Sequence, residues 1–484
     1  MDISPTTARR FHHPVLSICV LLTIVTALPI TVAENGRSSS NDGESVRSLS
    51  EIDTYDVLAI VFMIIGLAVS SAGGIGGGVI LVPAMVLIMG FDIKRATPIS
   101  NVAILGGAVA NTWFNVNKRH PTIDRPLIDP ELALGMIPVV IGGTVLGAVI
   151  NKLIPSYIVS ILFVVVLSVS DARMTLRGIR LFKKEVAQKK LVEATATEGK
   201  ADMPASPSEY IQASTPKTGC NDGVLEEKRL SISRSVTSEG FVAKSVEADE
   251  TGAGGELAQI LENERQFAWG PHLAILTCYL GVVAASIGDA SVNCGGVAYW
   301  VILLIEIPWV AGFVLVTSHY LYKVYLRKVN INYQYVEGDI KWTKRNVVLF
   351  PLGCAFAGIV AGMFGVGGGV ITGPIMIEMG IVPEVASSTM ALMILYSSAA
   401  ATAKFAVFDM IAWDWAALLC AVAFLVTSAS QIVILGFVRR TGRQSIIILC
   451  ISASVTIGTL LMTYQAIKIT IDDAGSHFSV DICS

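Results

Sequence analysis

Two short glycine runs in the sequence have the composition of an anion site built from backbone groups. The first reads Gly74-Ile75-Gly76-Gly77-Gly78, and the second reads Gly365-Val366-Gly367-Gly368-Gly369. Consecutive glycines interrupt a helix because they lack a Cβ and accept positive φ. The helix that starts after such a break points its first N–H groups into it, with a partial charge of about +0.5. The runs therefore predict a site for a small negatively charged ligand.

The glycine runs belong to a unit that occurs twice in the chain. The first copy continues with Val79, Ile80, Pro83, Met85, Gly90 and Ala96, and the second continues with Val370, Ile371, Pro374, Met376, Gly380 and Ala386. Broken hydrophobic segments at matching places in two halves are typical of secondary transporters with inverted repeats and a site near the membrane midplane. The alternative is that the glycines only allow close helix packing. Two matched copies favour the transporter interpretation.

Hydroxyl and amide side chains follow each glycine unit and add candidate ligands. They are Thr97, Ser100 and Asn101 in the first copy and Ser387, Ser388 and Thr389 in the second. Such residues also serve as N-caps or in helix packing. The predicted substrate-binding set consists of Gly74, Gly76, Gly77, Gly78, Thr97, Ser100, Asn101, Gly365, Gly367, Gly368, Gly369, Ser387, Ser388, Thr389 and Lys404.

Three ionisable residues lie in apolar segments of the sequence, and their presence there needs a physical reason. These are Lys404, Glu306 and Glu378, and a charge at the bilayer centre costs about 2.5 to 3.5 kcal/mol. Lys404 either reaches toward the membrane face, attracts the anion, or pairs with Glu306. Glu306 is a candidate carrier of a coupling proton.

The elements that must position these residues are membrane helices. Apolar windows predict spans at 57–72, 96–116, 132–153, 157–170, 273–287, 297–322, 347–363, 385–408, 413–438 and 446–464, with shorter pieces at 79–89 and 370–379. The fold class predicted is an all-α polytopic membrane protein of two inverted repeats. Each repeat contains one Gly-broken helix, and the chain has about ten to twelve membrane segments when half-helices are counted.

The start of the chain predicts entry into the secretory pathway. Residues 1–33 combine a basic pair, an apolar run and small residues, as in a signal peptide, with a signal anchor as the alternative. Residues 34–55 are then a lumenal or extracellular disordered segment. The positive-inside rule places the basic loop after residue 116 in the cytoplasm if both short pieces count as crossings. The predicted location is the plasma membrane or an endomembrane.

The chain divides into two membrane repeats and a long polar linker. The repeats are 56–172 and 346–466, two connecting helices lie at 267–325, and 467–484 is a lumenal or extracellular tail. Residues 173–266 are rich in Lys, Glu, Ser and Ala, and predict a disordered cytoplasmic linker. Cys294 and Cys483 fall on the lumenal side, and a disulfide between them is left open.

Composition and missing motifs exclude several classes of function. The 484 residues are 53% hydrophobic and 15% charged, with a net charge of -3. This balance fits a membrane protein and offers no basic field for nucleic acid. The sequence contains no His-Glu-x-x-His, Gly-x-Ser-Gly or ATP-binding loop motif. We therefore expect no enzyme activity, no cofactor and no metal, and energy from a substrate or ion gradient, with proton and sodium both open.

The paired motifs resemble a known family. Gly-Ile-Gly-Gly-Gly-Val-Ile-Leu-Val-Pro from Gly74 and Gly-Val-Gly-Gly-Gly-Val-Ile-Thr-Gly-Pro from Gly365 resemble the twin signature of the TauE/SafE sulfite exporters. The hydrophilic insert and the segment from Cys294 to Trp300 are similar to its eukaryotic branch. The resemblance implies export or import of a small sulfur-containing anion such as sulfite or a sulfonate.

A second class of function is an alternative to the transporter. A receptor or scaffold without transport would use the Ser-rich linker, where Ser231, Ser233 and Ser235 surround Arg234, as a phosphorylated docking segment. The oligomeric state is not encoded in any pattern of the sequence.

Overall fold

The computed structural model describes most of the chain. The described residues are 52–71, 74, 76–120, 123–201, 253–266, 268–292, 296–336, 338–441 and 445–472. The predicted signal peptide, most of the segment after it, Cys294, Cys483 and residues 473–484 of the predicted tail lie outside them. The chain separates into two units, one formed by Met1–Phe182 with Leu257–Ser484 and the other by Lys183–Glu256.

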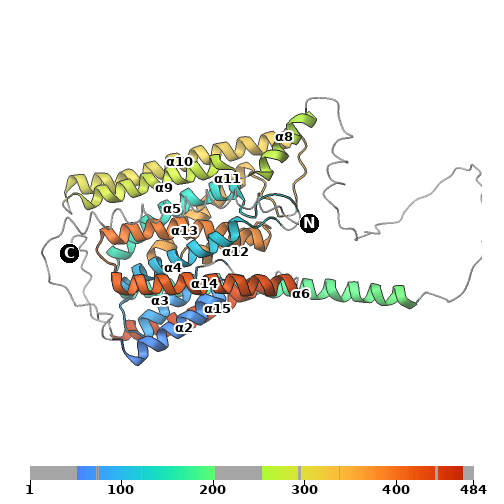
Figure 1. The fold of residues 1–484 in the computed structure, drawn as a ribbon. Helices are drawn as coiled ribbons and strands as arrows, with labels where there is room; N and C mark the ends of the chain where they lie inside the picture. Colours follow the sequence, from blue (N-terminus) through green and yellow to red (C-terminus); the bar gives the residue numbers. More distant parts are fainter. Residues whose placement is uncertain are drawn as a thin grey trace, which may run out of the picture. The chain divides into compact units, whose positions relative to one another are not determined.

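The described chain is built from helices, with a single isolated β-bridge between Arg119 and Pro126. The helices are α2 (Thr54–Ser71), α3 (Gly78–Leu87), α4 (Ile93–Val116), α5 (Pro130–Leu153), α6 (Ser156–Ala201), α8 (Ala253–Arg265), α9 (Trp269–Ala290), α10 (Val297–Asn330), α11 (Lys344–Phe364), α12 (Gly369–Glu378), α13 (Pro383–Val407), α14 (Trp413–Thr441) and α15 (Ser445–Asp472). Figure 1 shows the helices of the first unit running side by side as a bundle.

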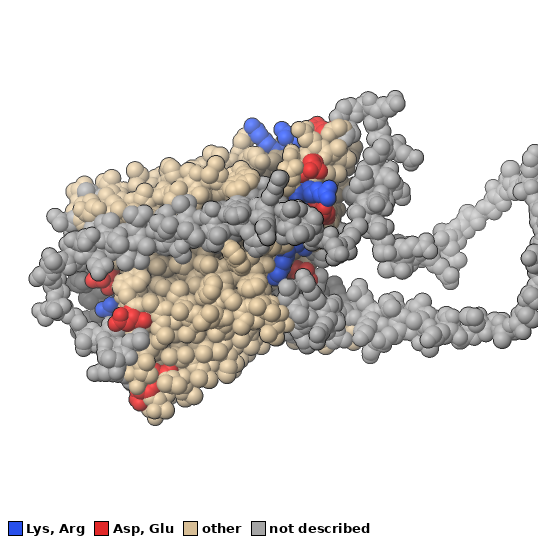
Figure 2. Space-filling view, in the orientation of Figure 1, with Lys and Arg blue, Asp and Glu red and all other residues tan. Residues whose placement is uncertain are grey.

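The bundle has the surface of a membrane protein. Within the described residues, eight helices are long and apolar enough to cross a bilayer, and α3 and α12 are shorter apolar helices. In Figure 2 the visible Lys, Arg, Asp and Glu side chains gather toward the two ends, and the described surface visible between them shows no charged residue. This uncharged belt is what a hydrocarbon layer requires. The predicted all-α polytopic membrane fold is confirmed.

The helices α4 and α13 form the buried centre of the bundle. They pack against each other, and nine-tenths of the apolar window of α13 is buried. Helix α4 carries polar side chains inside the protein, including Thr97, Ser100, Asn101 and Asn111. These residues lower its hydropathy and set α4 apart from the eight long apolar helices. Its N-terminus is capped by Asp92, whose carboxylate accepts the Lys94 N–H.

The two predicted helix breaks are present. Helix α3 begins at Gly78 after Gly77, and α12 begins at Gly369 after Gly368. Both cap glycines are left-handed, with φ of 76° and 71°, and no side chain caps either helix. A residue with a Cβ would be strained there. The sequence therefore folds into two interrupted helices because glycine stands at the positions that need positive φ.

Helices of each copy of the repeat pack against helices of the other copy in equivalent pairs. Helices α2 to α6 correspond to α11 to α15 in the predicted alignment. Helix α11 packs on α5 while its counterpart α2 packs on α14, and α4 packs on α14 while α13 packs on α5. Each contact thus has a partner in which the roles of the copies are swapped. Such swapped pairs are what a two-fold relation between the copies produces.

Helices α5 and α11 approach each other closely through small residues spaced four apart on each helix. A Cβ on Gly147 would lie 2.1 Å from the Ile359 carbonyl oxygen, and a Cβ on Gly362 would lie 2.0 Å from that of Thr144. Gly143 and Gly358 approach the facing backbones in the same way. This is the small-xxx-small packing of membrane helices, in which glycine lets two backbones meet.

The ends of the predicted linker differ from the prediction. Helix α6 continues through Ala201, and α8 occupies Ala253–Arg265, within the range 173–266 assigned to disorder. The segment after Arg173 is rich in Leu, Lys, Glu and Ala, which are strong helix formers and extend a helix already nucleated in the bundle. Residues 202–252 lie outside the described residues.

We predict that replacing Gly362 with alanine weakens the fold. The added Cβ overlaps the Thr144 carbonyl, and overpacking of this kind lowers the free energy of unfolding by about 1 to 3 kcal/mol. Equilibrium unfolding in mixed detergent micelles measures the change. The matched control is Gly312→Ala on α10, where nothing lies within 4 Å of the new Cβ and helix propensity favours alanine by up to about 1 kcal/mol. Equal stability of the two variants would contradict the close α5–α11 contact.

Candidate functional site

The two glycine breaks meet inside the bundle. A Cβ on Gly78 would lie 2.4 Å from the Gly365 carbonyl oxygen, so the start of α3 touches the end of α11. A Cβ on Gly76 would lie 3.0 Å from Ile104 of α4 and 3.3 Å from Ile394 of α13. Apart from Gly76, which is half-buried, the described residues of both runs are buried. The uncapped N-terminus of α3 therefore begins against the glycine run that precedes α12, and both starts are buried.

Each break is closed by the hydroxyl segment of the opposite copy. A Cβ on Gly74 would lie 2.5 Å from the carbonyl oxygen and 2.7 Å from Oγ of Ser387, and a Cβ on Gly365 would lie 2.7 Å from the Thr97 carbonyl oxygen. Thr97 and Ser387 are equivalent positions of the repeat. The contact is therefore reciprocal, and glycine is required at both places because backbone or hydroxyl oxygen occupies the space of a side chain.

Thr97 and Ser100 present hydroxyl groups at this junction. Ser100 Oγ donates to the Gly365 carbonyl oxygen at 2.8 Å and so joins α4 to the broken end of α11. The Thr97 hydroxyl is fully buried without a hydrogen-bond partner. A buried hydroxyl without a partner costs free energy. Thr97 Oγ1 is thus a polar atom available to a ligand.

Other residues of the predicted set make their own contacts around this junction. Gly77 faces Leu67 and Ser70 of α2, and Gly368 faces Ala361 and Met393. Asn101 Nδ2 donates to the Thr97 carbonyl oxygen within α4, and Thr389 Oγ1 accepts the Asp129 N–H at the start of α5. Gly367 has a φ of 74° in its run, Gly369 is the first residue of α12, and Ser388 is buried in α13.

Lys404 forms a separate cluster with two carboxylates. Its ammonium donates to Asp289 at the end of α9 and, at 3.0 Å, to Glu306 Oε1 of α10. The Lys404 side chain has no exposed area, so it does not reach the membrane face, and the predicted pairing with Glu306 is observed. We call Lys404, Asp289 and Glu306 the Lys404 cluster. Among the described residues, no group of His, Cys, Asp and Glu could hold a metal ion.

Two assignments from sequence change with the structure. Glu378 is the last residue of α12 and is exposed, so its charge needs no buried partner. Asp289 was missed, because it follows the predicted span 273–287. An acid immediately after an apolar window is the signal that would have identified it. Its partner Lys404 lies 115 residues away in the chain.

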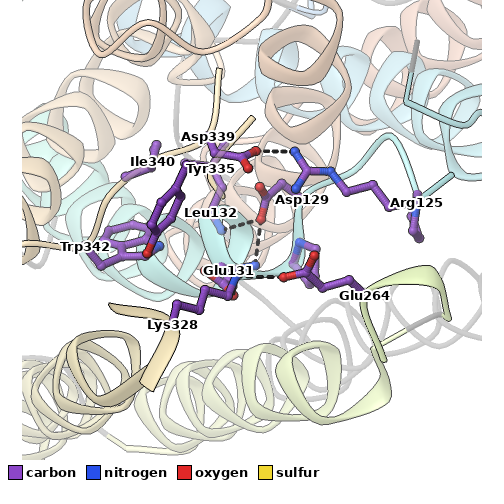
Figure 3. Close-up of a pocket in the computed structure, with 12 residues that line it drawn as sticks. Arg125, Asp129, Glu131, Leu132, Glu264, Lys328, Tyr335, Asp339, Ile340 and Trp342 are labelled. Atoms are coloured by element: carbon purple, nitrogen blue, oxygen red, sulfur yellow. Dashed lines mark hydrogen bonds and ion pairs between the residues drawn. The ribbon is translucent and has the colours of Figure 1, made fainter. Parts of the chain in front are cut away.

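A second charged cluster lies where α5 begins and α10 ends (Figure 3). Lys328 bridges Glu131 and Glu264, each at 2.8 Å, and Arg125 pairs with Asp339. We call Lys328, Glu131 and Glu264 the Lys328 cluster. Together with Asp129, Tyr335 and Trp342 these residues line a cavity of about 50 Å³. Glu264 belongs to α8, so the cluster fixes the end of the predicted linker to the bundle.

Burial and charge change the pKa values around this cavity. Burial alone would lower the pKa of Arg125, but the charges of Asp129 and Asp339 outweigh it and raise that pKa. Burial raises the pKa of Tyr335 to about 12. Burial and the charge of Arg125 lower the pKa of His120 in the adjoining loop. The loop therefore holds a fixed cation beside a histidine that stays neutral at pH 7.

These features define a class of protein. The chain is a multi-pass helical membrane protein in which two equivalent broken helices meet inside the bundle. It belongs to the sulfite exporter TauE/SafE family, whose model matches residues 6–190 and 255–457. The resemblance of the glycine motifs to that family is thereby confirmed.

The relatives found are plant proteins. Sulfite exporter TauE/SafE family protein 3 of Arabidopsis thaliana is 30% identical over 411 residues, which cover 85% of this chain and 78% of that protein. Family protein 1 of the same plant is 25% identical over 428 residues, which cover 86% of this chain and 85% of the relative. No solved structure matches the chain significantly.

We predict that Lys404→Met destabilises the protein strongly. The change leaves the buried acids Asp289 and Glu306 without their cation, which costs about 3 to 5 kcal/mol. Equilibrium unfolding in detergent checks this value, with Lys468→Met on the exposed face of α15 as the control. The triple variant that adds Asp289→Asn and Glu306→Gln removes the uncompensated charges and recovers most of the loss. A triple variant as unstable as the single one would show that the three residues do not act as one cluster.

We also predict that His120 makes the fold sensitive to mild acid. Because the pKa of His120 is lower in the folded protein than in the unfolded chain, the unfolded chain binds a proton first as the pH falls below about 6.5. Stability contributed by neutral His120 is present above that pH and is lost below it. His120→Gln reduces the fall in melting temperature between about pH 7.5 and pH 5, whereas His319→Gln at an exposed site of α10 leaves it unchanged. An identical pH profile for His120→Gln and the parent would refute this role.

Proposed function

We propose that the chain is a secondary transporter of a small anion, with sulfite or an organosulfonate as the substrate. The observation that carries the proposal is the reciprocal contact of the two breaks, Gly74 against Ser387 and Gly365 against Thr97. Family membership supports it, since the relatives are named as sulfite exporters. Transport moves an intact ion, so the proposal includes no catalytic residue and no cofactor.

The substrate site of this proposal is the junction of the breaks. The N-termini of α3 and α12 have no side-chain caps, and each offers N–H groups and a partial positive charge of about +0.5 to an oxyanion. The Thr97 hydroxyl would donate to a substrate oxygen, and Ser387 would do the same from the opposite copy. Neutral donors suit a transporter, because they bind an anion less tightly than fixed cations and release it more readily.

The two repeats offer a way to open the site to either side of the membrane. In the proposed cycle, the two copies rock against each other about the junction and open it to one side at a time. Inverted copies make the two open states alike, so the gradients of substrate and coupling ion decide between export and import. The apolar pattern of residues 1–33 supports a membrane of the secretory pathway as the location.

The proposal predicts that Thr97→Val impairs transport without unfolding the protein. Valine keeps the shape of threonine and removes the one hydroxyl, and the loss of a hydrogen bond to a charged ligand is worth about 1.5 to 3 kcal/mol, or roughly ten- to a hundredfold in affinity. The measurement is uptake of ³⁵S-labelled sulfite into proteoliposomes, with empty liposomes as the background.

The matched control for this experiment is Thr112→Val. Thr112 lies on the same helix, is also fully buried, and has a hydroxyl without a hydrogen-bond partner, but it is about 22 Å farther along α4 by helix rise. We expect Thr112→Val to transport normally. Equal flux in both variants would show that Thr97 does not bind the substrate. Absence of sulfite or sulfonate flux in the parent would refute the proposed function.

A further inference from the structure

The Lys404 cluster has an excess of negative charge in a dry place. It contains one ammonium and two carboxylates, and the exposed fractions of the Lys404, Asp289 and Glu306 side chains are 0%, 0% and 5%. With both acids ionised, one negative charge is uncompensated. Isolated charges in such surroundings cost far more free energy than neutral groups, and the usual resolution is a change of protonation.

The hydrogen bonds of the cluster leave a place for a proton. Lys404 uses one oxygen of each acid, and Asp289 Oδ1 and Glu306 Oε2 are buried without any hydrogen-bond partner. An ionised carboxylate normally accepts several hydrogen bonds. A proton on one of these free oxygens makes the cluster neutral and leaves a single ion pair with Lys404.

Among the described residues, Lys404 is the cation that acts on Asp289 and Glu306. The charges that act on Lys404 are those of Glu306 and Asp289. The Phe408 ring centroid lies 5.9 Å from Lys404 Nζ and 5.0 Å from Lys152 Nζ of α5. Charged residues in the neighbouring loops and helix ends include Asp92, Lys94 and Arg95 at the start of α4 and Asp409 and Asp414 beyond α13. Helices α11 and α12, which also pack on α13, carry their charges at the opposite end.

We propose that the Lys404 cluster is a proton-binding site, that Glu306 carries the proton, and that the proton moves in the same direction as the transported anion. The proposal rests on the proposed transport function. Glu306 is chosen over Asp289 because it retains a small exposed fraction, which a proton needs in order to enter and leave.

The direction of coupling follows from charge. Ile394 of α13 contacts the first break, and Lys404 lies about 15 Å farther along the same helix. At that separation, with an effective dielectric constant of about 20, the uncompensated charge of an ionised cluster weakens anion binding about sixfold. A bound anion therefore favours the protonated cluster, and the proton and the anion share one state of the transporter.

The experiment compares gradient-driven uptake with exchange in proteoliposomes. If one proton accompanies each anion, an inward gradient of one pH unit raises the accumulation ratio of labelled sulfite about tenfold. Glu306→Gln loses this response and keeps exchange of internal for external sulfite. Sulfite itself binds a proton near neutral pH, but this affects the parent and the variant equally, so their difference isolates Glu306.

Two matched controls separate the cluster from a general effect of charge. Glu384→Gln makes the same substitution in the first turn of α13, and Asp414→Asn removes an exposed acid near the Lys404 end. Both controls retain the tenfold response. A Glu306→Gln protein that still accumulates sulfite with the gradient, or a parent that ignores the gradient, overturns the proposal.

Proton binding at Glu306 can also be measured without transport, which tests the proposal if the parent protein moves no sulfite. Infrared spectra are recorded for the detergent-solubilised parent and for Glu306→Gln at about pH 7. If Glu306 holds a proton, the difference between parent and variant contains the carbonyl stretch of a protonated carboxylic acid. The corresponding difference for Glu384→Gln does not contain it. Absence of this band from the parent minus Glu306→Gln spectrum overturns proton binding at Glu306, independently of the substrate.

Discussion

Backbone hydrogen bonding inside a bilayer is the constraint on which this structure depends. Lipid offers no partner to a free N–H or carbonyl group, so a broken helix is tolerated only where protein or a bound ligand satisfies it. The two breaks meet this requirement by packing against each other and against the hydroxyl segments of the opposite copy. The repeat, the glycines and the buried helices α4 and α13 are consequences of enclosing these two interruptions.

The same constraint explains why glycine stands at positions of two different kinds. At Gly368 the reason is conformation, since its φ is positive directly before a helix, and Gly77 has the same conformation with Leu67 close to the place of a Cβ. At Gly78 the reason is space, because the Gly365 carbonyl oxygen occupies the place of a Cβ. Gly74 and Gly365 combine both reasons. A single run of glycines therefore meets two requirements, positive φ and close approach. Substitution of a glycine costs backbone strain, steric overlap or both, depending on its position.

The sequence predicted the helices well and the polar contacts poorly, for physical reasons. Helix α12 begins and ends within one residue of the predicted piece 370–379, because apolar length and glycine are local signals. The continuation of α6 to Ala201 was missed because its composition suits either a helix or a disordered linker. The link from Lys404 to Asp289 depends on how distant helices pack, which no local pattern encodes. Thr97 was named in the predicted set, but only its missing hydrogen-bond partner distinguishes it from its neighbours.

The connecting helix α10 is attached to each repeat at a different end. Near its start Glu306 binds Lys404 of the second repeat, and near its end Lys328 binds Glu131 of the first. Any rotation of one repeat against the other must therefore alter one of these attachments. The Lys328 cluster is partly open to water, with exposed fractions of 10% to 26%, so solvent screens its charges. The Lys404 cluster has no such screening, and the gain or loss of one proton there changes the attachment of α10 far more than the same event at the other end.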